Sequence, residues 1–567
     1  MEGTSLDMGT IFTFSLNGRS FFLFEGTGVP GGTFQLEVLI PANAYSGHGT
    51  VLSTITIGDD GKFSVLLPDD YARAGNILTF GYAGDAFAGL VAAENRNTVL
   101  ETVTKLPDWI RCRQSLRNLF MGCTSLRRID ADLSWTSTVT NMGQLFASCT
   151  SLEEMPNLNT SNATNTMYMF GDCYQLTEGI PLDLAKSTDA HGMYFNCRNL
   201  ESVPNINTVK NLNFYYMFKN CYKLTHIEGI ETGAATRFTS MFEDCRTLET
   251  IPYMDTSKGT NFDAMFKNCY KLKNYETLDT RNGTSFSQTF YNCDAFETKD
   301  DIKVTDVSKG TVFDNMLAYC NNLQSFRDDW DFSSAVSVEG FLRDCPKLKS
   351  FPSYSFPSVT RMADMFAGDV TLQTVGAMDT PKVNRMQRIF FGCYKLEASP
   401  LRNTATCQNM NRIFYSAGTQ VPDGLIWYPI DMSNVTTAEG FIFGCNVKEI
   451  PYLNTEKVQT PHYNTSGKNH IFSSSLVTIG GMNMSAVTVD DLWLSSNNLT
   501  NLGPLDGLKM NLTLNCPNLT HDSAVTVINS LGEVSGKTLK FHTNVYSTLT
   551  ADEIAIATAK GWTISAY

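Results

Sequence analysis

Cysteine is the residue of this chain whose spacing most invites a chemical interpretation. The motif Met-Phe-x-x-Cys-x-x-Leu recurs at a period of 24 residues, and Cys173, Cys221, Cys245 and Cys269 all stand in it. Regularly spaced thiols could ligate a metal, but metal sites need close pairs of Cys or His. No C-x-x-C or H-x-x-x-H pair occurs among the 15 Cys and 7 His.

Small apolar thiols suit a tight interior column instead, and we predict a structural ladder without metal. Its members are Cys149, Cys173, Cys197, Cys221, Cys245, Cys269 and Cys293. Cys112 and Cys407 lie off this register, and the sequence suggests no role for them.

Two other patterns could suggest catalysis or nucleotide binding. The acidic pairs Asp300-Asp301 and Asp328-Asp329 resemble glycosidase carboxylates, but adjacent residues on a turn do not flank a scissile bond. Gly26–Gly31 matches G-x-G-x-x-G, yet Thr33–Ile40 after it alternates like a strand, where a dinucleotide site needs a helix. We therefore expect no enzyme activity and no cofactor.

The residue after each ladder cysteine is expected to point outward, and in five successive repeats tyrosine alternates with arginine there. The five residues are Tyr174, Arg198, Tyr222, Arg246 and Tyr270. Such a stripe could bind a glycan by stacking and hydrogen bonding, or a protein through hot-spot residues. It could equally cover neighbouring repeats, or be a relic of duplication.

Lengthened repeats supply a second candidate set, because insertions in repeat proteins map to loops that often bind ligands. Its members are Trp330, Trp427 and Tyr428. Exposed tryptophan would favour binding, but a buried tryptophan that fills an irregular repeat is an open alternative.

The elements that position these residues follow from one repeat. Apolar residues at −7, −4 and −3, such as Phe262, Met265 and Phe266, share one helical face with Cys269. Apolar residues at +3, +6 and +9 indicate an extended segment, and Asp or Asn with Thr then turns the chain and caps the next helix. We predict an α/β solenoid of about 24-residue units, with strands on one side and helices on the other.

Four segments of the chain differ in pattern. Residues 1–90 read as a small all-β sandwich or barrel, 91–118 as a junction and N-terminal cap, 119–519 as the solenoid and 520–567 as a C-terminal cap. In the first segment we predict hairpins around Asn17-Gly18 and around Gly58–Gly61.

The two caps have signatures of their own. Pro107–Trp109 is expected to open a capping helix before the first repeat. Near the other end, Thr550 and Glu553 form the capping box of a helix that Gly561 closes, between strands at Thr538–His542 and Trp562–Ile564.

Bulk composition excludes some partners. The net charge of −14 argues against nucleic acid, which needs clustered Lys and Arg. No run of 18 apolar residues exists, so we expect no membrane insertion. The N-terminus has no positive charge before Arg19 and no apolar core, so we expect no secretory signal.

The repeated Met-Phe-x-x-Cys-x-x-Leu unit with its Asp-Thr-Ser turn resembles the BspA-like leucine-rich repeat family over roughly residues 116–567. The segment around Ala555–Trp562 is similar to the ends of such proteins from gut Bacteroidetes and their phages. The resemblance implies a leucine-rich-repeat-like solenoid and surface adhesins that bind host proteins or other cells. It carries no catalytic residues.

A compact β domain ahead of the repeats, without a visible signal, favours a phage tail or head fibre or receptor-binding protein over an exported adhesin. Such a protein would be part of the virion, assembled in the host cytoplasm. It would bind a host cell-surface protein or glycan, contact other virion proteins through residues 1–90, and could form a homo-oligomer. The alternatives are a bacterial adhesin at the cell surface and a purely structural virion component.

Overall fold

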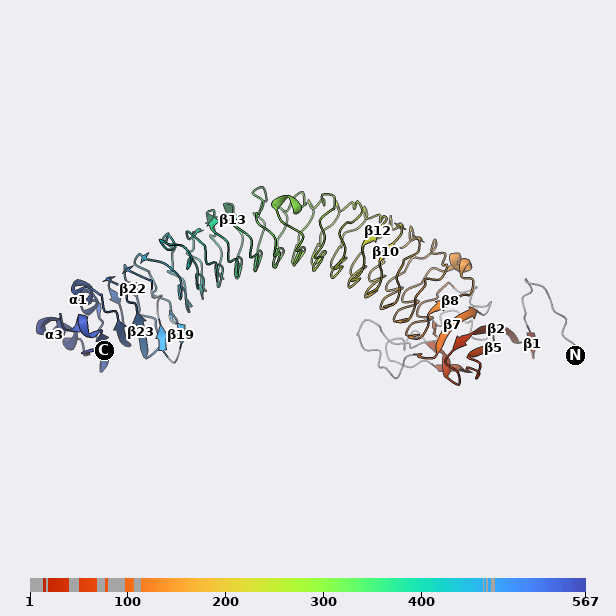
Figure 1. The fold of residues 1–567 in the computed structure, drawn as a ribbon, viewed down its shortest axis with the longest axis horizontal. Coiled ribbons are helices and arrows are strands. Elements are labelled where there is room, and N and C mark those ends of the chain that lie inside the picture. The colour runs from red at the N-terminus through yellow and green to blue at the C-terminus, as the bar shows by residue number, and fades with distance from the viewer. Residues whose placement is uncertain are drawn as a thin grey trace. The chain divides into compact units, whose positions relative to one another are not determined.

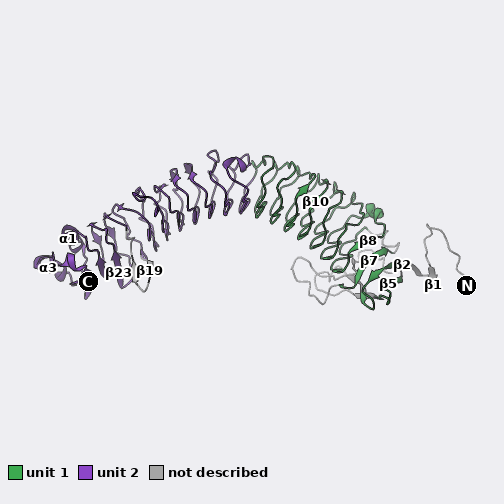
Figure 2. Cartoon of the chain, viewed as in Figure 1, with its two compact units in different colours: residues 1–282 green, residues 283–567 purple. Residues whose placement is uncertain are grey.

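The computed structural model describes residues 14–16, 19–39, 50–68, 77–79, 97–106, 114–461, 463–465, 468–470 and 475–567. Within it the chain divides into two compact units, residues 1–282 and residues 283–567, which Figure 2 shows in green and purple. Each unit is described by itself below.

Unit 1 begins with seven strands in its described part. They are β1 (Phe14–Leu16), β2 (Arg19–Gly28), β3 (Thr33–Leu39), β4 (Thr50–Thr56), β5 (Lys62–Pro68), β6 (Ile77–Thr79) and β7 (Leu100–Lys105). Strand β2 pairs with β1, β5 and β7, whereas β3 pairs with β4 and β6, all antiparallel. The buried Phe63 ring lies 5.0 Å from Phe24 on β2 and 5.3 Å from Phe34 on β3 (centroid distances), so these rings connect the two sheets.

The predicted first hairpin is confirmed, because Leu16 pairs with Arg19 across β1 and β2, although Asn17-Gly18 lies outside the described residues. The prediction of a second hairpin, around Gly58–Gly61, is wrong. Strands β4 and β5 flank the turn at Gly58–Gly61 but pair with β3 and β2, so that turn carries the chain from one sheet to the other. Closure of these sheets into a sandwich or barrel stays a prediction.

Strand β7 joins this β region to the first repeat. It runs parallel to β8 (Arg128–Ile129), with Thr102 opposite Arg128 and Val103 opposite Ile129 (Figure 1). Strand β7 therefore adds its backbone hydrogen bonds to the first turn of the solenoid. The helix predicted at Pro107–Trp109 lies outside the described residues.

The rest of unit 1 is a solenoid of short parallel strands. Its regular elements are β8, η6 (a 3-10 helix, Ser134–Thr138), β9 (Leu182–Asp183), β10 (Ser202–Val203), β11 (Ile206–Asn207) and β12 (His226–Ile227). Ser202 pairs with His226, and Asn141 pairs with Asn165, so each residue faces its counterpart 24 positions later. The predicted repeat length is confirmed.

The prediction of a short helix in each repeat is wrong. The segment before each ladder cysteine is instead a run of tight turns. Within one turn segment the N–H of Cys149 donates to the carbonyl of Phe146 at 3.0 Å, three residues back. Alternate N–H groups donate to the next repeat, as Phe146 does to Met169 at 2.9 Å. Gln144 and Ser148 have φ of 56° and 61°, which no α-helix contains.

A run of tight turns and an α-helix give the same spacing of apolar residues, and this is why the helix prediction failed. Two four-residue turns place residues −7, −4, −3 and 0 on one side, as a helix with 3.6 residues per turn also does. The sequence did carry a distinguishing signal. The residue before the cysteine is Gly122, Ser148, Asp172, Asn196 and Asn220 in successive repeats, and all five have positive φ. Gly, Asn and Asp tolerate that conformation best.

Unit 2 continues the same construction. Its solenoid elements are η7 (a 3-10 helix, Lys299–Asp301), β13 (Ser350–Phe351), β14 (Tyr354–Ser355), β15 (Thr374–Val375), β16 (Met378–Asp379), β17 (Leu401–Arg402), β18 (Glu449–Ile450), β19 (Tyr463–Thr465), β20 (Lys468–His470), β21 (Thr478–Ile479), β22 (Met482–Asn483), β23 (Asp491–Ser495), β24 (Asn501–Leu502), β25 (Leu505–Asp506) and β26 (Asn511–Asn515). Except for the antiparallel pair β19 and β20, the strands that pair here are parallel.

Unit 2 ends in the only α-helices of the described chain. Helices α1 (His521–Ser530), α2 (Thr543–Tyr546) and α3 (Ala551–Ala559) accompany β27 (Lys537–Phe541) and β28 (Trp562–Ala566) (Figure 1). The predicted capping box is present, since Glu553 N–H donates to Thr550 Oγ1 and Thr550 N–H donates to Glu553. No helix in the described ranges is both long and apolar enough to cross a bilayer.

Candidate binding surface

The ladder cysteines lie inside the solenoid, where the thiols from Cys149 to Cys269 bond the repeat before them. Cys149 Sγ donates to the carbonyl of Phe120 at 3.0 Å, and Cys221 Sγ donates to that of Tyr194 at 3.2 Å. The same bond joins Cys173 to Phe146, Cys197 to Phe170, Cys245 to Phe218 and Cys269 to Phe242, and Cys293 is buried in unit 2. Burial raises the pKa of the Cys149 and Cys221 thiols, which keeps them protonated as donors.

A second buried column consists of the threonines that follow the Asp or Asn turns. Thr160 Oγ1 donates to the carbonyl of Asp183 at 2.9 Å, and Thr256 Oγ1 donates to that of Asp279 at 3.0 Å. The turn role predicted for the preceding acid is also present, because Ser257 N–H donates to Asp255 Oδ1 at 3.0 Å. Cys407, off the ladder, is buried with its Sγ 3.4 Å from the Asn409 carbonyl, and Cys112 lies outside the described residues.

In each of the two acidic pairs, one aspartate stabilises the local backbone or a neighbouring side chain by hydrogen bonds. Asp301 accepts the N–H groups of Glu297 and Thr298 at 2.9 Å and so caps η7. Asp329 accepts from Arg327 Nε at 2.8 Å and Nη2 at 2.6 Å, and the hydrogen bond from Arg327 lowers the pKa of Asp329. In the residues that the structure describes, no three His, Cys, Asp or Glu side chains cluster as ligands for one metal ion.

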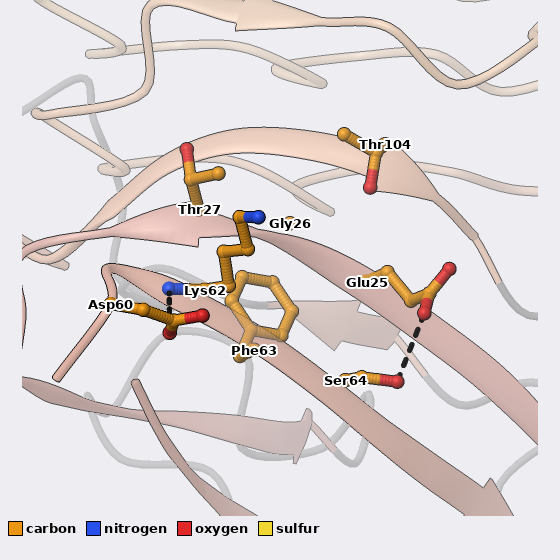
Figure 3. Close-up of a pocket in the computed structure, with 8 residues that line it drawn as sticks. All are labelled: Glu25, Gly26, Thr27, Asp60, Lys62, Phe63, Ser64 and Thr104. Atoms are coloured by element: carbon orange, nitrogen blue, oxygen red, sulfur yellow. Dashed lines mark hydrogen bonds between the residues drawn. The ribbon is translucent and has the colours of Figure 1, made fainter. Parts of the chain in front are cut away.

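The glycine motif lies on β2 and the turn after it, beside an open cavity of about 460 Å³. Its polar groups already bond one another: Ser64 Oγ donates to Glu25 at 3.0 Å, and Lys62 N–H donates to Asp60 at 3.0 Å. Figure 3 shows Glu25 and Asp60 on opposite sides of Phe63, so their carboxylates do not converge on one point. Strand β3 follows the motif, as the sequence predicts.

The alternating tyrosines and arginines stand on successive turns of unit 1 and contact each other in pairs. Arg198 Cζ lies 4.4 Å from the ring centroid of Tyr174, and Arg246 Cζ lies 4.3 Å from that of Tyr222. Both arginines are exposed, whereas Tyr174, Tyr222 and Tyr270 are half-buried. Each guanidinium therefore covers the ring of the tyrosine in the preceding repeat. We call these five residues the Tyr–Arg column.

Arg246 is held in place by a neighbouring acid. Its Nε and Nη2 donate to Asp244 Oδ1 at 3.1 Å and 3.0 Å. This leaves Nη1 of Arg246 available to a ligand. No carboxylate forms an ion pair with Arg198 among the described residues. The column thus presents guanidinium N–H groups and tyrosine edges to solvent.

The three residues of the second candidate set, from the lengthened repeats, differ in exposure. Trp330 is only 6% exposed and packs with its ring centroid 5.2 Å from Phe326, so its assignment to the surface is wrong. Trp427 is half-buried, 5.4 Å from the Phe414 ring. Tyr428 is 42% exposed, with Arg402 Cζ 4.5 Å from its ring centroid. Trp330 is buried because it also packs against Phe332 and Phe341, at centroid distances of 5.9 Å and 6.3 Å.

The sequence did not single out an aromatic cluster on the turn segments of unit 1, where Tyr168 is buried and His191 and Phe195 are half-buried. Tyr168 contacts His191 and Phe195 edge-on, at centroid distances of 5.1 Å and 5.7 Å. Nearby, Lys219 Nζ lies 4.5 Å from the Tyr216 ring centroid and 2.7 Å from Glu243. Tyr168 and Tyr216 themselves have positive φ, 49° and 60°, which the helix prediction did not anticipate.

Comparison with known proteins assigns the chain to a protein family. The model for the family described as "Mycoplasma protein of unknown function, DUF285" matches residues 114–230, 236–354 and 347–451, more than half of the chain. The chain belongs to the DUF285 family. No curated protein gives a significant match to this DUF285 chain.

Two solved structures are similar to this DUF285 chain in part. A leucine-rich repeat protein from Bacteroides ovatus is 14% identical over 69% of this chain and 88% of its own, with a TM-score of 0.31. A leucine rich cell surface protein from Faecalibacterium prausnitzii is 17% identical over 47% of this chain and 82% of its own, with a TM-score of 0.26. Sequence identities and TM-scores this low support no inference about the function of this chain. The Tyr–Arg column lies within the matched DUF285 segments.

Proposed function

We propose that this protein is a non-enzymatic binding protein that attaches to a ligand on a cell surface. The Tyr–Arg column carries the proposal, because it displays five half-buried or exposed binding-type side chains in register on successive turns. Tyrosine and arginine are the residues that most often dominate binding energy at interfaces. A solenoid repeats such a row along an extended surface, which suits attachment rather than chemistry in a cleft.

The finer form of the proposal is a phage tail or head fibre or receptor-binding protein. In that form residues 1–90 dock to other virion proteins, and the solenoid contacts a host cell-surface protein or glycan. The continuity of β7 with β8 supports this division, since it couples the β region directly to the first repeat. A bacterial surface adhesin would use the same column but reach the surface by export.

Binding to cells tests the proposal. Labelled full-length protein is titrated onto intact Bacteroidetes cells while released reducing sugar is followed in the supernatant. Saturable binding without sugar release is expected. Absence of binding would contradict the attachment role, and release of sugar would contradict the non-enzymatic part.

Immunogold microscopy tests the finer form. Antibodies raised against the full-length protein are applied to purified phage particles and to intact bacteria. Label at virion fibres is expected from the fibre proposal, and particles without label would refute it. Label confined to the bacterial surface would establish the adhesin form instead.

A further inference from the structure

We propose that the Tyr–Arg column binds a uronic-acid polysaccharide, laid along the solenoid with its carboxylates on the guanidinium groups. This inference rests on the proposed function and names its ligand class. It begins from the charge of the column, which differs from that of the whole chain. Net charge is −14, yet one exposed cation lies on each of four successive turns: Arg198 and Arg246 of the column, and Lys223 and Lys271, each directly after a column tyrosine.

The spacing of these cations favours a polymer over a folded protein. Paired backbones in the solenoid lie roughly 4.8 Å apart, so Arg198 and Arg246, two turns apart, are separated by roughly 10 Å. An extended polysaccharide advances by nearly one turn per sugar residue and repeats the same carboxylate at a regular interval. The surface of an ordinary globular protein, unlike that of a solenoid, has no such periodicity, so the column matches a repeating ligand best.

The exposure of the tyrosines argues against single-stranded nucleic acid, the other periodic polyanion. Bases bind by stacking on open aromatic faces. Here Arg198 covers the Tyr174 ring and Arg246 covers the Tyr222 ring, so the rings offer edges rather than faces. Tyrosine edges with guanidinium N–H groups are suited to hydroxyl and carboxylate oxygens.

Partial neutralisation sets how much negative charge the column can accept. Asp244 engages Arg246, and Glu249 lies 3.5 Å from Lys271, whereas no ion pair of Arg198 or Lys223 occurs in the described part of unit 1. A sparsely charged polymer fits this arrangement better than a polyphosphate does. Two kinds of polymer would present this chemistry, one with a carboxylate on every sugar and one with a carboxylate on every second sugar. The test below separates them.

The test uses full-length protein and isothermal titration calorimetry. The probes are galacturonic acid oligomers, with one carboxylate per sugar, hyaluronan oligomers, with one per two sugars, and neutral chitin oligomers of equal length. We expect at least one of the uronic-acid series to bind, more tightly with length until it spans the column of roughly 19 Å. Binding should weaken as salt is raised.

Paired variants locate the site. R198Q/R246Q removes both guanidinium groups and should weaken Kd roughly tenfold or more, because charge-assisted hydrogen bonds are lost. K210Q/K258Q removes two exposed cations of the same unit, also 48 residues apart but outside the column, and should change Kd less than twofold. Circular dichroism melts check that both variants fold like the wild type.

Several results would overturn the inference. Wild-type protein that binds none of the charged oligomers, or binds the neutral series equally well, would do so. So would an R198Q/R246Q variant that keeps wild-type affinity. If wild-type protein nevertheless binds intact cells, only the ligand class fails; if it binds neither cells nor oligomers, the proposed function fails as well.

Discussion

Replacing Asp369 by cysteine should stabilise unit 2. Asp369 occupies a ladder position between Cys345 and Cys393 and is fully buried. Its Oδ1 accepts the Cys345 N–H at 2.7 Å, but Oδ2 is buried without a hydrogen-bond partner. A thiol at this position could donate to the Leu342 carbonyl, as Cys345 does to Leu317 at 3.2 Å.

The magnitude follows from the unpartnered oxygen. A buried polar group without a partner costs about 1–3 kcal/mol, and a thiol would remove that cost while adding a weak hydrogen bond. The Cys345 N–H loses Asp369 Oδ1 as its acceptor, but it can donate to the Leu342 carbonyl instead, as the Cys149 N–H donates to that of Phe146 at 3.0 Å. We therefore expect Asp369→Cys to raise the free energy of unfolding of unit 2 by about 1–3 kcal/mol at pH 7. For a unit of this size, that corresponds to roughly 2–4 °C in Tm per kcal/mol.

The gain should depend on pH in a defined direction. Burial raises the pKa of the Asp369 carboxyl well above its usual range. Above the unfolded value of about 3.9 the unfolded chain releases this proton while the folded chain keeps it, so wild-type stability falls as pH rises. Cysteine does not titrate there, so the difference in Tm between variant and wild type should widen from pH 4 to pH 7.

Scanning calorimetry of both proteins at pH 4 and pH 7 measures this difference. Ala417→Cys is the matched control, because it fills another ladder position that lacks cysteine without removing a carboxyl group. It should shift Tm by an amount that does not depend on pH. A D369C variant that is less stable than wild type at pH 7, or a gap that is constant with pH, would refute the reasoning.

Three further substitutions test the fold and the corrected assignments. Ser148→Val should destabilise unit 1 by about 1–3 kcal/mol, because φ is 61° there, whereas Ser148→Gly should be nearly neutral; urea titration compares them. Cys221→Ala should cost about 1–2 kcal/mol in the same assay, since it removes a thiol bonded to Tyr194 at 3.2 Å and leaves a small void. Trp330→Ala should lower unfolding free energy by about 3–5 kcal/mol, and cell binding per folded molecule should stay unchanged, as expected for a core residue.

Much of the fold could be predicted from the sequence because stacking repeats the same environment. Every turn demands a small buried residue at the ladder position, so the period and the burial of Cys149 and Cys221 follow from the spacing of the cysteines. The capping box at Thr550 and Glu553 was predictable for a similar reason, since it is a local hydrogen-bond pattern.

What could not be predicted depends on geometry that spacing does not encode. Met142, Leu145, Phe146 and Cys149 fit a helix face and two stacked turns equally well, and the positive φ of Gln144 and Ser148 separates the two structures. The burial of Trp330 depends on Phe326 and its neighbours in three dimensions. The contact of Arg198 with Tyr174 depends on rotamers that a residue pattern cannot specify.

The most direct test of the binding role is the affinity of three full-length proteins for intact Bacteroidetes cells, measured side by side. These are the wild type, R198Q/R246Q and K210Q/K258Q. If the Tyr–Arg column is the binding surface, the lysine variant binds like the wild type and the arginine variant binds roughly tenfold more weakly or worse. If the arginine variant binds cells as tightly as the wild type, the column is not the surface that attaches this protein to cells.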